Sequence, residues 1–180
     1  MAAVQFDLVP HPSTPPGEPF RLWAQVEYAG AFGASATCNI WFGVAAPIQR
    51  FRIPQSVEPL RRDELWRTTC FEAFVQEEGE AEYCEFNFAP SGDWAAYDFT
   101  GPREGMAEAE LANPPYVRLE DNLVWWSLGA TFTLEAGRRW TLGLSAVIEE
   151  ADGTKSYWAL AHGGPEPDFH DPACFTARLG

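Results

Sequence analysis

Short runs in which hydrophobic and polar residues alternate recur along this chain. In the first of them, Leu22, Ala24 and Val26 occupy one face of a predicted strand. Clusters of Gly, Pro, Asn or Asp, which are typical of turns, separate most of the runs. The pattern predicts strands within residues 21–28, 37–44, 83–88, 123–132, 141–148, 156–161 and 174–179.

One run, residues 65–76 (LWRTTCFEAFVQ), fits two periodicities. Trp66, Cys70 and Phe74 have helical spacing, whereas Phe71, Ala73 and Val75 alternate as in a strand. The following turn, EEGE at 77–80, leads into the alternating run at 83–88. This order favours a hairpin over a helix.

The resulting fold class is all-β. Fifteen Gly and 15 Pro residues suit many short strands joined by turns. With the hairpin, we expect about nine or ten strands and no long helix. This pattern is typical of antiparallel sandwiches and barrels. A length of 180 residues fits a single domain over residues 1–180.

The net charge narrows the possible partners. Acidic residues outnumber basic ones by 26 to 12, which gives a formal charge of −14. Such a charge repels nucleic-acid backbones and anionic lipid, so we expect neither nucleic-acid nor membrane binding. No apolar run approaches a membrane span, and the start of the chain lacks a basic region before its first apolar stretch. We therefore expect a cytoplasmic protein with its four cysteines reduced.

The densest group of polar and aromatic residues lies between positions 82 and 106. In the strand at 83–88, Tyr83, Glu85 and Asn87 share one face, opposite Cys84, Phe86 and Phe88. An aromatic ring beside a carboxylate, an amide and a guanidinium can cover the apolar face of a sugar and bond to its hydroxyls. The candidate ligand-binding residues of this segment are Glu85, Asn87, Trp94, Tyr97 and Arg103. An ordinary solvated sheet face is the alternative.

A second group lies on the Gly/Pro-rich loop at 161–170 (AHGGPEPDFH). His162, Asp168 and His170 could bind a ligand, hold a divalent metal or supply a general base. No further metal ligand is identifiable elsewhere in the sequence, so a rigid surface loop is the alternative.

Other chemistries have less support. A haem would need Met106 with His162 or His170 as axial ligands, and no CxxCH motif is present. No GxSxG, P-loop or GxGxxG motif occurs. The adjacent Trp125 and Trp126 should point to opposite faces of a strand, one into the core and one outward.

The two segments at 65–76 and 82–99 resemble the DOMON-like and family-9 carbohydrate-binding-module group. The matching positions are Glu72 and Phe74, then Tyr83, Glu85, Phe86 and Pro90. The tail at 157–175 (YWALAHGGPEPDFHDPACF) is similar to that of a bacterial DOMON-like subgroup with no assigned role. Thr68-Thr69 stands where the group often has an acidic pair that holds calcium.

This resemblance implies an antiparallel β-sandwich that binds sugar or haem as an accessory module. By motif position it carries over only Glu85 and Arg103 as binding residues. We therefore expect a non-catalytic module whose small-molecule ligand is a carbohydrate. The alternatives are a haem-binding or redox accessory domain, and an enzyme built on the 161–170 loop.

Overall fold

Residues 3–179, which the computed structural model describes, form twelve strands and three short 3-10 helices, with no α-helix among them. Between these residues, no helix is long and apolar enough to cross a membrane. The strands are β1 (Val4–Pro10), β2 (Leu22–Phe32), β3 (Ser35–Val44), β4 (Cys70–Glu77), β5 (Tyr83–Phe88), β6 (Trp94–Phe99), β7 (Ala107–Glu108), β8 (Tyr116–Asp121), β9 (Trp126–Glu135), β10 (Trp140–Glu149), β11 (Lys155–Ala159) and β12 (Ala177–Leu179). The 3-10 helices are η1 (Ile48–Arg50), η2 (Leu65–Arg67) and η3 (Pro172–Cys174).

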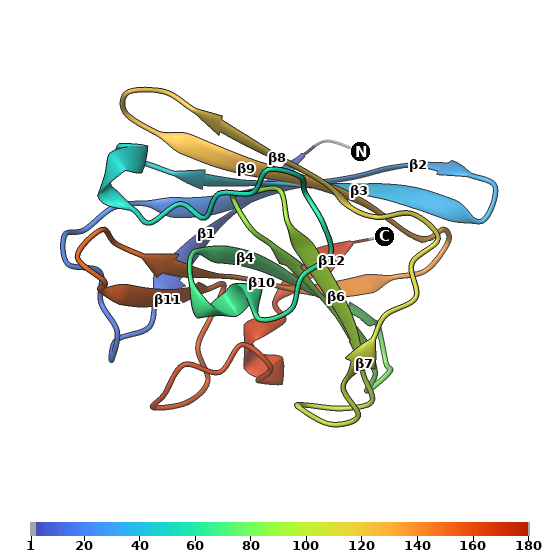
Figure 1. The fold of residues 1–180 in the computed structure, drawn as a ribbon. Coiled ribbons are helices and arrows are strands. Elements are labelled where there is room, and N and C mark those ends of the chain that lie inside the picture. Colours follow the sequence, from blue (N-terminus) through green and yellow to red (C-terminus); the bar gives the residue numbers. More distant parts are fainter. Residues whose placement is uncertain (1–2, 180) are drawn as a thin grey trace.

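The strands form one strongly curled antiparallel sheet. Their order is β7-β6-β5-β4-β10-β11-β1-β2-β3-β9-β8, and β12 pairs with β10. β1 joins the two halves, because Val4–Leu8 pair with β2 whereas Val9 and Pro10 pair with β11. The sheet thus has two halves that face each other across the interior (Figure 1). One half consists of β1, β2, β3, β9 and β8, and the other of β7, β6, β5, β4, β10 and β11.

The main core fills the space between the two halves. Phe42 on β3, Phe71 on β4 and Trp126 on β9 are fully buried there, and the ring of Phe71 packs against the other two. Alternation in β5 sends Phe86 and Phe88 into this core, as the sequence predicted. Burial of so many large apolar side chains supplies the main driving force of folding.

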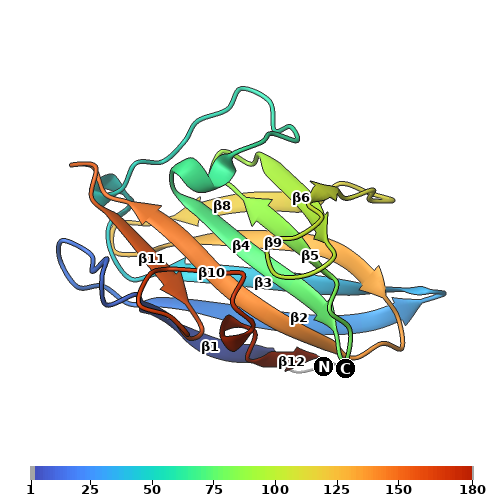
Figure 2. The ribbon, with the colours of Figure 1, turned by 90° about the horizontal axis from the view of Figure 1, so that it is seen from below.

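A second apolar group, here called the outer cluster, covers the opposite face of the β6-β5-β4-β10-β11 half. It consists of Phe74, Tyr83, Ala95, Tyr97, Phe99, Val147, Ala159, Phe169, Cys174 and Phe175. The last three belong to the segment at 160–176, which we call the C-terminal loop and which lies across β10 and β11 (Figure 2). The ring of Phe175 rests where a side chain at Gly143 would stand, so a glycine on β10 is what lets this loop lie close to the sheet.

The prediction of an antiparallel all-β fold is confirmed. The hairpin is also confirmed, since β4 and β5 pair with Phe71 opposite Phe88. The predicted count of about nine or ten strands was too low, and β1, β6, β7 and β8 are not among the predicted runs. β7 has only two residues, and β8 carries charge along an exposed edge, so neither gives a strong periodic signal.

Truncation of Trp126 to alanine should destabilise the fold by about 3–5 kcal/mol, because it leaves a large cavity beside Phe51 and Phe71. Trp125 is the matched control: it is 40% exposed, whereas Trp126 is fully buried, as the alternation predicted. Trp125→Ala should change stability by about 0.5 kcal/mol or less. Urea unfolding measures both, and equal losses would contradict the assignment of faces.

Candidate functional site

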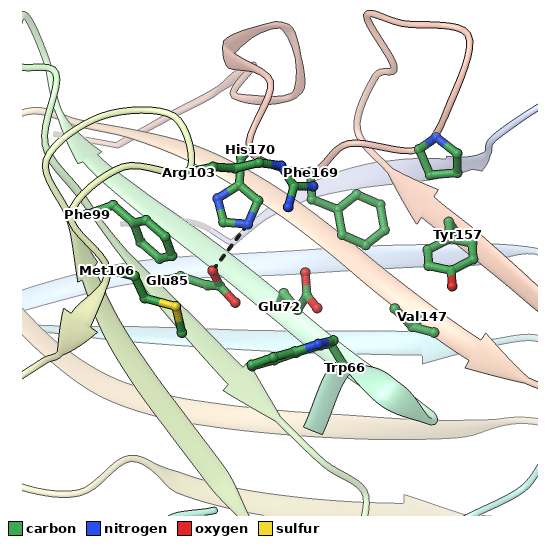
Figure 3. A pocket seen from close by; sticks show the side chains of 11 residues that line it. Trp66, Glu72, Glu85, Phe99, Arg103, Met106, Val147, Tyr157, Phe169 and His170 are labelled. Carbon is green, nitrogen blue, oxygen red and sulfur yellow. Dashed lines mark ion pairs between the residues drawn. The ribbon is translucent and has the colours of Figure 1, made fainter. Parts of the chain in front are cut away.

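A cavity of about 380 Å³ opens on the outer face of the β5-β4-β10-β11 region. The C-terminal loop and the turn at 100–106 form its rim (Figure 3). Its lining combines acidic, basic and aromatic groups. These residues are Trp66, Glu72, Glu85, Phe99, Arg103, Met106, Val147, Tyr157, Pro167, Phe169 and His170.

Strand register brings two buried glutamates to the floor of this cavity. Glu72 on β4 stands opposite Asn87 on β5, and Glu85 lies two residues before Asn87 on the same face. Ser145 on β10 stands opposite Glu72 from the other side. All four residues are buried, so their polar atoms depend on one another for hydrogen bonds.

Each carboxyl group has one fixed hydrogen-bond donor. The Ser145 hydroxyl donates to Oε2 of Glu72 at 3.0 Å, and Nδ2 of Asn87 donates to Oε1 of Glu85 at 2.6 Å. The Cys70 thiol donates to Oδ1 of Asn87, which orients the amide. The remaining carboxyl oxygens of both glutamates are directed into the cavity (Figure 3).

A chain of contacts joins the sheet to the loops that form the rim. The backbone N–H of Arg103 donates to the hydroxyl of Tyr83, and this hydroxyl is hydrogen-bonded to Nδ1 of His170 at 2.7 Å. Nε2 of His170 faces Oε2 of Glu85 at 3.6 Å. Arg103 has a φ of 60°, a strained conformation for a residue with a side chain, and the hydrogen bond to Tyr83 helps to hold it.

Burial sets the protonation of these groups. It raises the pKa of Glu72 well above its usual range, and the neighbouring Glu85 carboxylate raises it further. Burial also raises the pKa of Glu85, against the opposing effects of Asn87 and Arg103. The pKa of His170 is lowered to about 4, mainly by burial and then by the charge of Arg103. At neutral pH the contact between His170 and Glu85 therefore involves an uncharged imidazole.

Arg103 forms an ion pair on the rim. Its Nε and Nη2 both donate to Oδ1 of Asp168, at 3.1 and 2.8 Å. The same carboxylate accepts the backbone N–H of His170, and these donors lower the pKa of Asp168 against its desolvation. The pair is partly exposed, so it positions the two loops and adds little stability.

The aromatic walls come from separate segments. Trp66 is on η2, Phe99 ends β6, Tyr157 is on β11 and Phe169 is in the C-terminal loop. Trp66 packs edge-on against Tyr97, with ring centres 5.9 Å apart. Its indole is half-buried and presents a flat apolar wall beside the two carboxyl groups (Figure 3).

The structure brings together most of the residues predicted from the sequence. Glu85, Arg103 and His170 line the cavity, while Asn87 and Asp168 bond to residues of its lining.

Three predicted residues neither line this cavity nor hydrogen-bond to its lining through their side chains. Trp94 packs against the main core on the opposite face of β6, with Arg61 over its ring, because an odd separation of three places it away from Tyr97. Tyr97 lies behind Trp66 and donates its hydroxyl to Asp63. His162 contacts His11 and the carbonyl of Val9 instead of joining His170.

Eight lining residues were not among the predicted ligand-binding residues: Trp66, Glu72, Phe99, Met106, Val147, Tyr157, Pro167 and Phe169. Glu72 could have been found, because alternation in a β4–β5 hairpin places it on the face of Glu85 and Asn87. No local pattern brings Trp66, Tyr157 and Phe169 to that face, since tertiary packing decides their positions.

The geometry does not fit the metal or haem alternatives. Among residues 3–179, no three His, Cys, Asp or Glu side chains are grouped so that they could hold a metal ion. Met106 and His170 do line the same cavity, as axial ligation would require. However, Nδ1 of His170 is hydrogen-bonded to Tyr83 and Nε2 lies 3.6 Å from Oε2 of Glu85, so both nitrogens already have polar neighbours.

Comparison with known proteins shows a shared fold. No family model matches the chain, and neither does any curated protein. A solved structure from Bacteroides uniformis ATCC 8492, described as a "putative carbohydrate-binding protein", is similar to it with a TM-score of 0.64 and 15% identity. The similarity covers 97% of this chain and 84% of that chain. The resemblance to the DOMON-like group stays a prediction.

His170 should remain uncharged from pH 8 down to about pH 5, because its pKa in the folded protein is about 4 rather than the usual 6.5. Between pH 6.5 and about pH 4 the unfolded chain binds more protons than the folded chain. The stability that His170 contributes is therefore complete above pH 6.5 and is lost as the pH falls toward 4. An NMR titration of the imidazole measures this, with urea-unfolded protein as the control. A folded-state midpoint near the unfolded value would contradict the buried position.

Proposed function

We propose that the cavity binds a carbohydrate without cleaving it. One observation carries the proposal: a flat indole and two buried carboxyl groups line the same space. An indole packs against the C–H face of a sugar ring, and carboxyl oxygens accept hydrogen bonds from its hydroxyls. A volume of about 380 Å³ lies within the usual size range of small-molecule sites.

The polar groups of the cavity are held in place before any ligand binds. Ser145 fixes Glu72, Asn87 fixes Glu85, and Tyr83 fixes His170. Side chains that are already ordered lose little entropy on binding, which favours affinity for a polar ligand. The fold shared with the Bacteroides protein, itself described as carbohydrate-binding, supports the same class of ligand.

Trp66→Ala should weaken sugar binding about tenfold, equivalent to about 1.4 kcal/mol, because the sugar loses its apolar wall. Trp125→Ala, which removes an exposed tryptophan that does not line this cavity, is the matched control and should bind normally. A glycan array followed by calorimetry on the best ligand measures both, and the sugar should be recovered intact. Loss of binding in Trp125→Ala with none in Trp66→Ala would place the site elsewhere.

A further inference from the structure

The cavity contains two carboxyl oxygens that have no hydrogen-bond donor in the described part of the chain. Oε2 of Glu72 is bonded to Ser145, but Oε1 has no partner. Oε1 of Glu85 is bonded to Asn87, whereas Oε2 is 3.6 Å from His170, longer than a hydrogen bond. Glu72 and Glu85 are only 3% and 5% exposed, and both free oxygens are directed into the cavity (Figure 3).

Among residues 3–179, no cationic side chain of the lining forms an ion pair with either acid, although the charge of Arg103 acts on both. The guanidinium of Arg103 is the one cationic side chain that lines the cavity among residues 3–179, and Asp168 already holds it through two hydrogen bonds. His170 is uncharged at neutral pH because burial lowers the pKa of its imidazole to about 4. Glu72 and Glu85 therefore face the cavity without a cation of their own.

Buried carboxyl groups in this situation favour a cationic ligand. Two like charges close together in a poorly solvated site cannot both ionise cheaply. Burial raises the pKa of both glutamates, and the neighbouring Glu85 carboxylate raises the pKa of Glu72 further. A cation between them would offset both the repulsion and the lost hydration. The indole of Trp66 and the ring of Tyr157 line the same cavity, and aromatic faces attract ammonium groups.

We propose that the cavity selects a sugar carrying a protonated amino group over its neutral analogues. The ammonium donates hydrogen bonds to the free oxygens of Glu72 and Glu85, while the sugar ring lies against Trp66. The inference rests on the proposed carbohydrate function and adds the chemical class of the sugar. Neutral sugars fill the same space but leave the two acids without a counter-charge.

The test compares three forms of each sugar ring by calorimetry at pH 7: the hexosamine, its N-acetyl derivative and the parent hexose, for the gluco, galacto and manno series. At least one hexosamine should bind ten times or more tightly than both of its neutral analogues.

Glu72→Gln and Glu85→Gln keep the side-chain shape but replace a group that can ionise with one that cannot, so each should abolish that preference. Glu166→Gln, an exposed acid on the C-terminal loop, makes the same change in net charge and should keep it.

The outcomes separate this inference from the proposed function. Equal binding of amino and neutral sugars, or a preference that survives both Glu72→Gln and Glu85→Gln, would overturn the amino-sugar inference and leave carbohydrate binding standing. No binding of any sugar in the panel or on the glycan array would overturn both. Thermal unfolding of each variant shows whether it is folded, and we expect both glutamine variants to be folded because they bury an uncharged group.

Discussion

The buried carboxyl group of Glu85 is the constraint on which the candidate site depends. A carboxyl group removed from water needs polar neighbours, and these come from different parts of the chain. Asn87 supplies one from the same strand, and His170 faces it from the C-terminal loop. His170 is in turn held by Tyr83, whose hydroxyl also accepts the backbone N–H of Arg103. One polar network thus links the sheet to both loops that shape the cavity.

Apolar packing makes this network possible. The outer cluster seals the sheet face around it, with Phe74 beside His170 and Phe175 at ring-centre distances of 5.2 and 5.5 Å. The network alone would be costly, because buried polar groups stabilise a fold only when their hydrogen bonds are made. The cavity is therefore a gap left between a sealed apolar layer and a fixed polar floor, which suits a ligand that has both an apolar face and polar edges.

The sequence predicted what depends on local alternation. The opposite faces of Glu85 and Phe86, the β4–β5 hairpin and the contrast in burial between Trp125 and Trp126 all follow from the two-residue period of a strand. Sequence-based prediction failed where loops decide the position of a side chain. His162 and His170 are close in sequence, but only His170 turns toward Tyr83 and Glu85, whereas His162 bonds to Val9 on β1. Trp94 was predicted to share a site with Tyr97 because the two are close in the sequence, but alternation along β6 places it on the opposite face.

A crystal structure with the tightest-binding sugar of the panel tests the central claim most directly. We predict that the sugar lies against Trp66 in the cavity, within hydrogen-bond distance of Glu72 and Glu85, with the contact between Tyr83 and His170 intact. A second surface offers a real alternative, because Trp23, Trp41 and Trp125 line a shallow depression on the outer face of the β2-β3-β9-β8 half. Sugar bound there, with the cavity empty, would contradict the account.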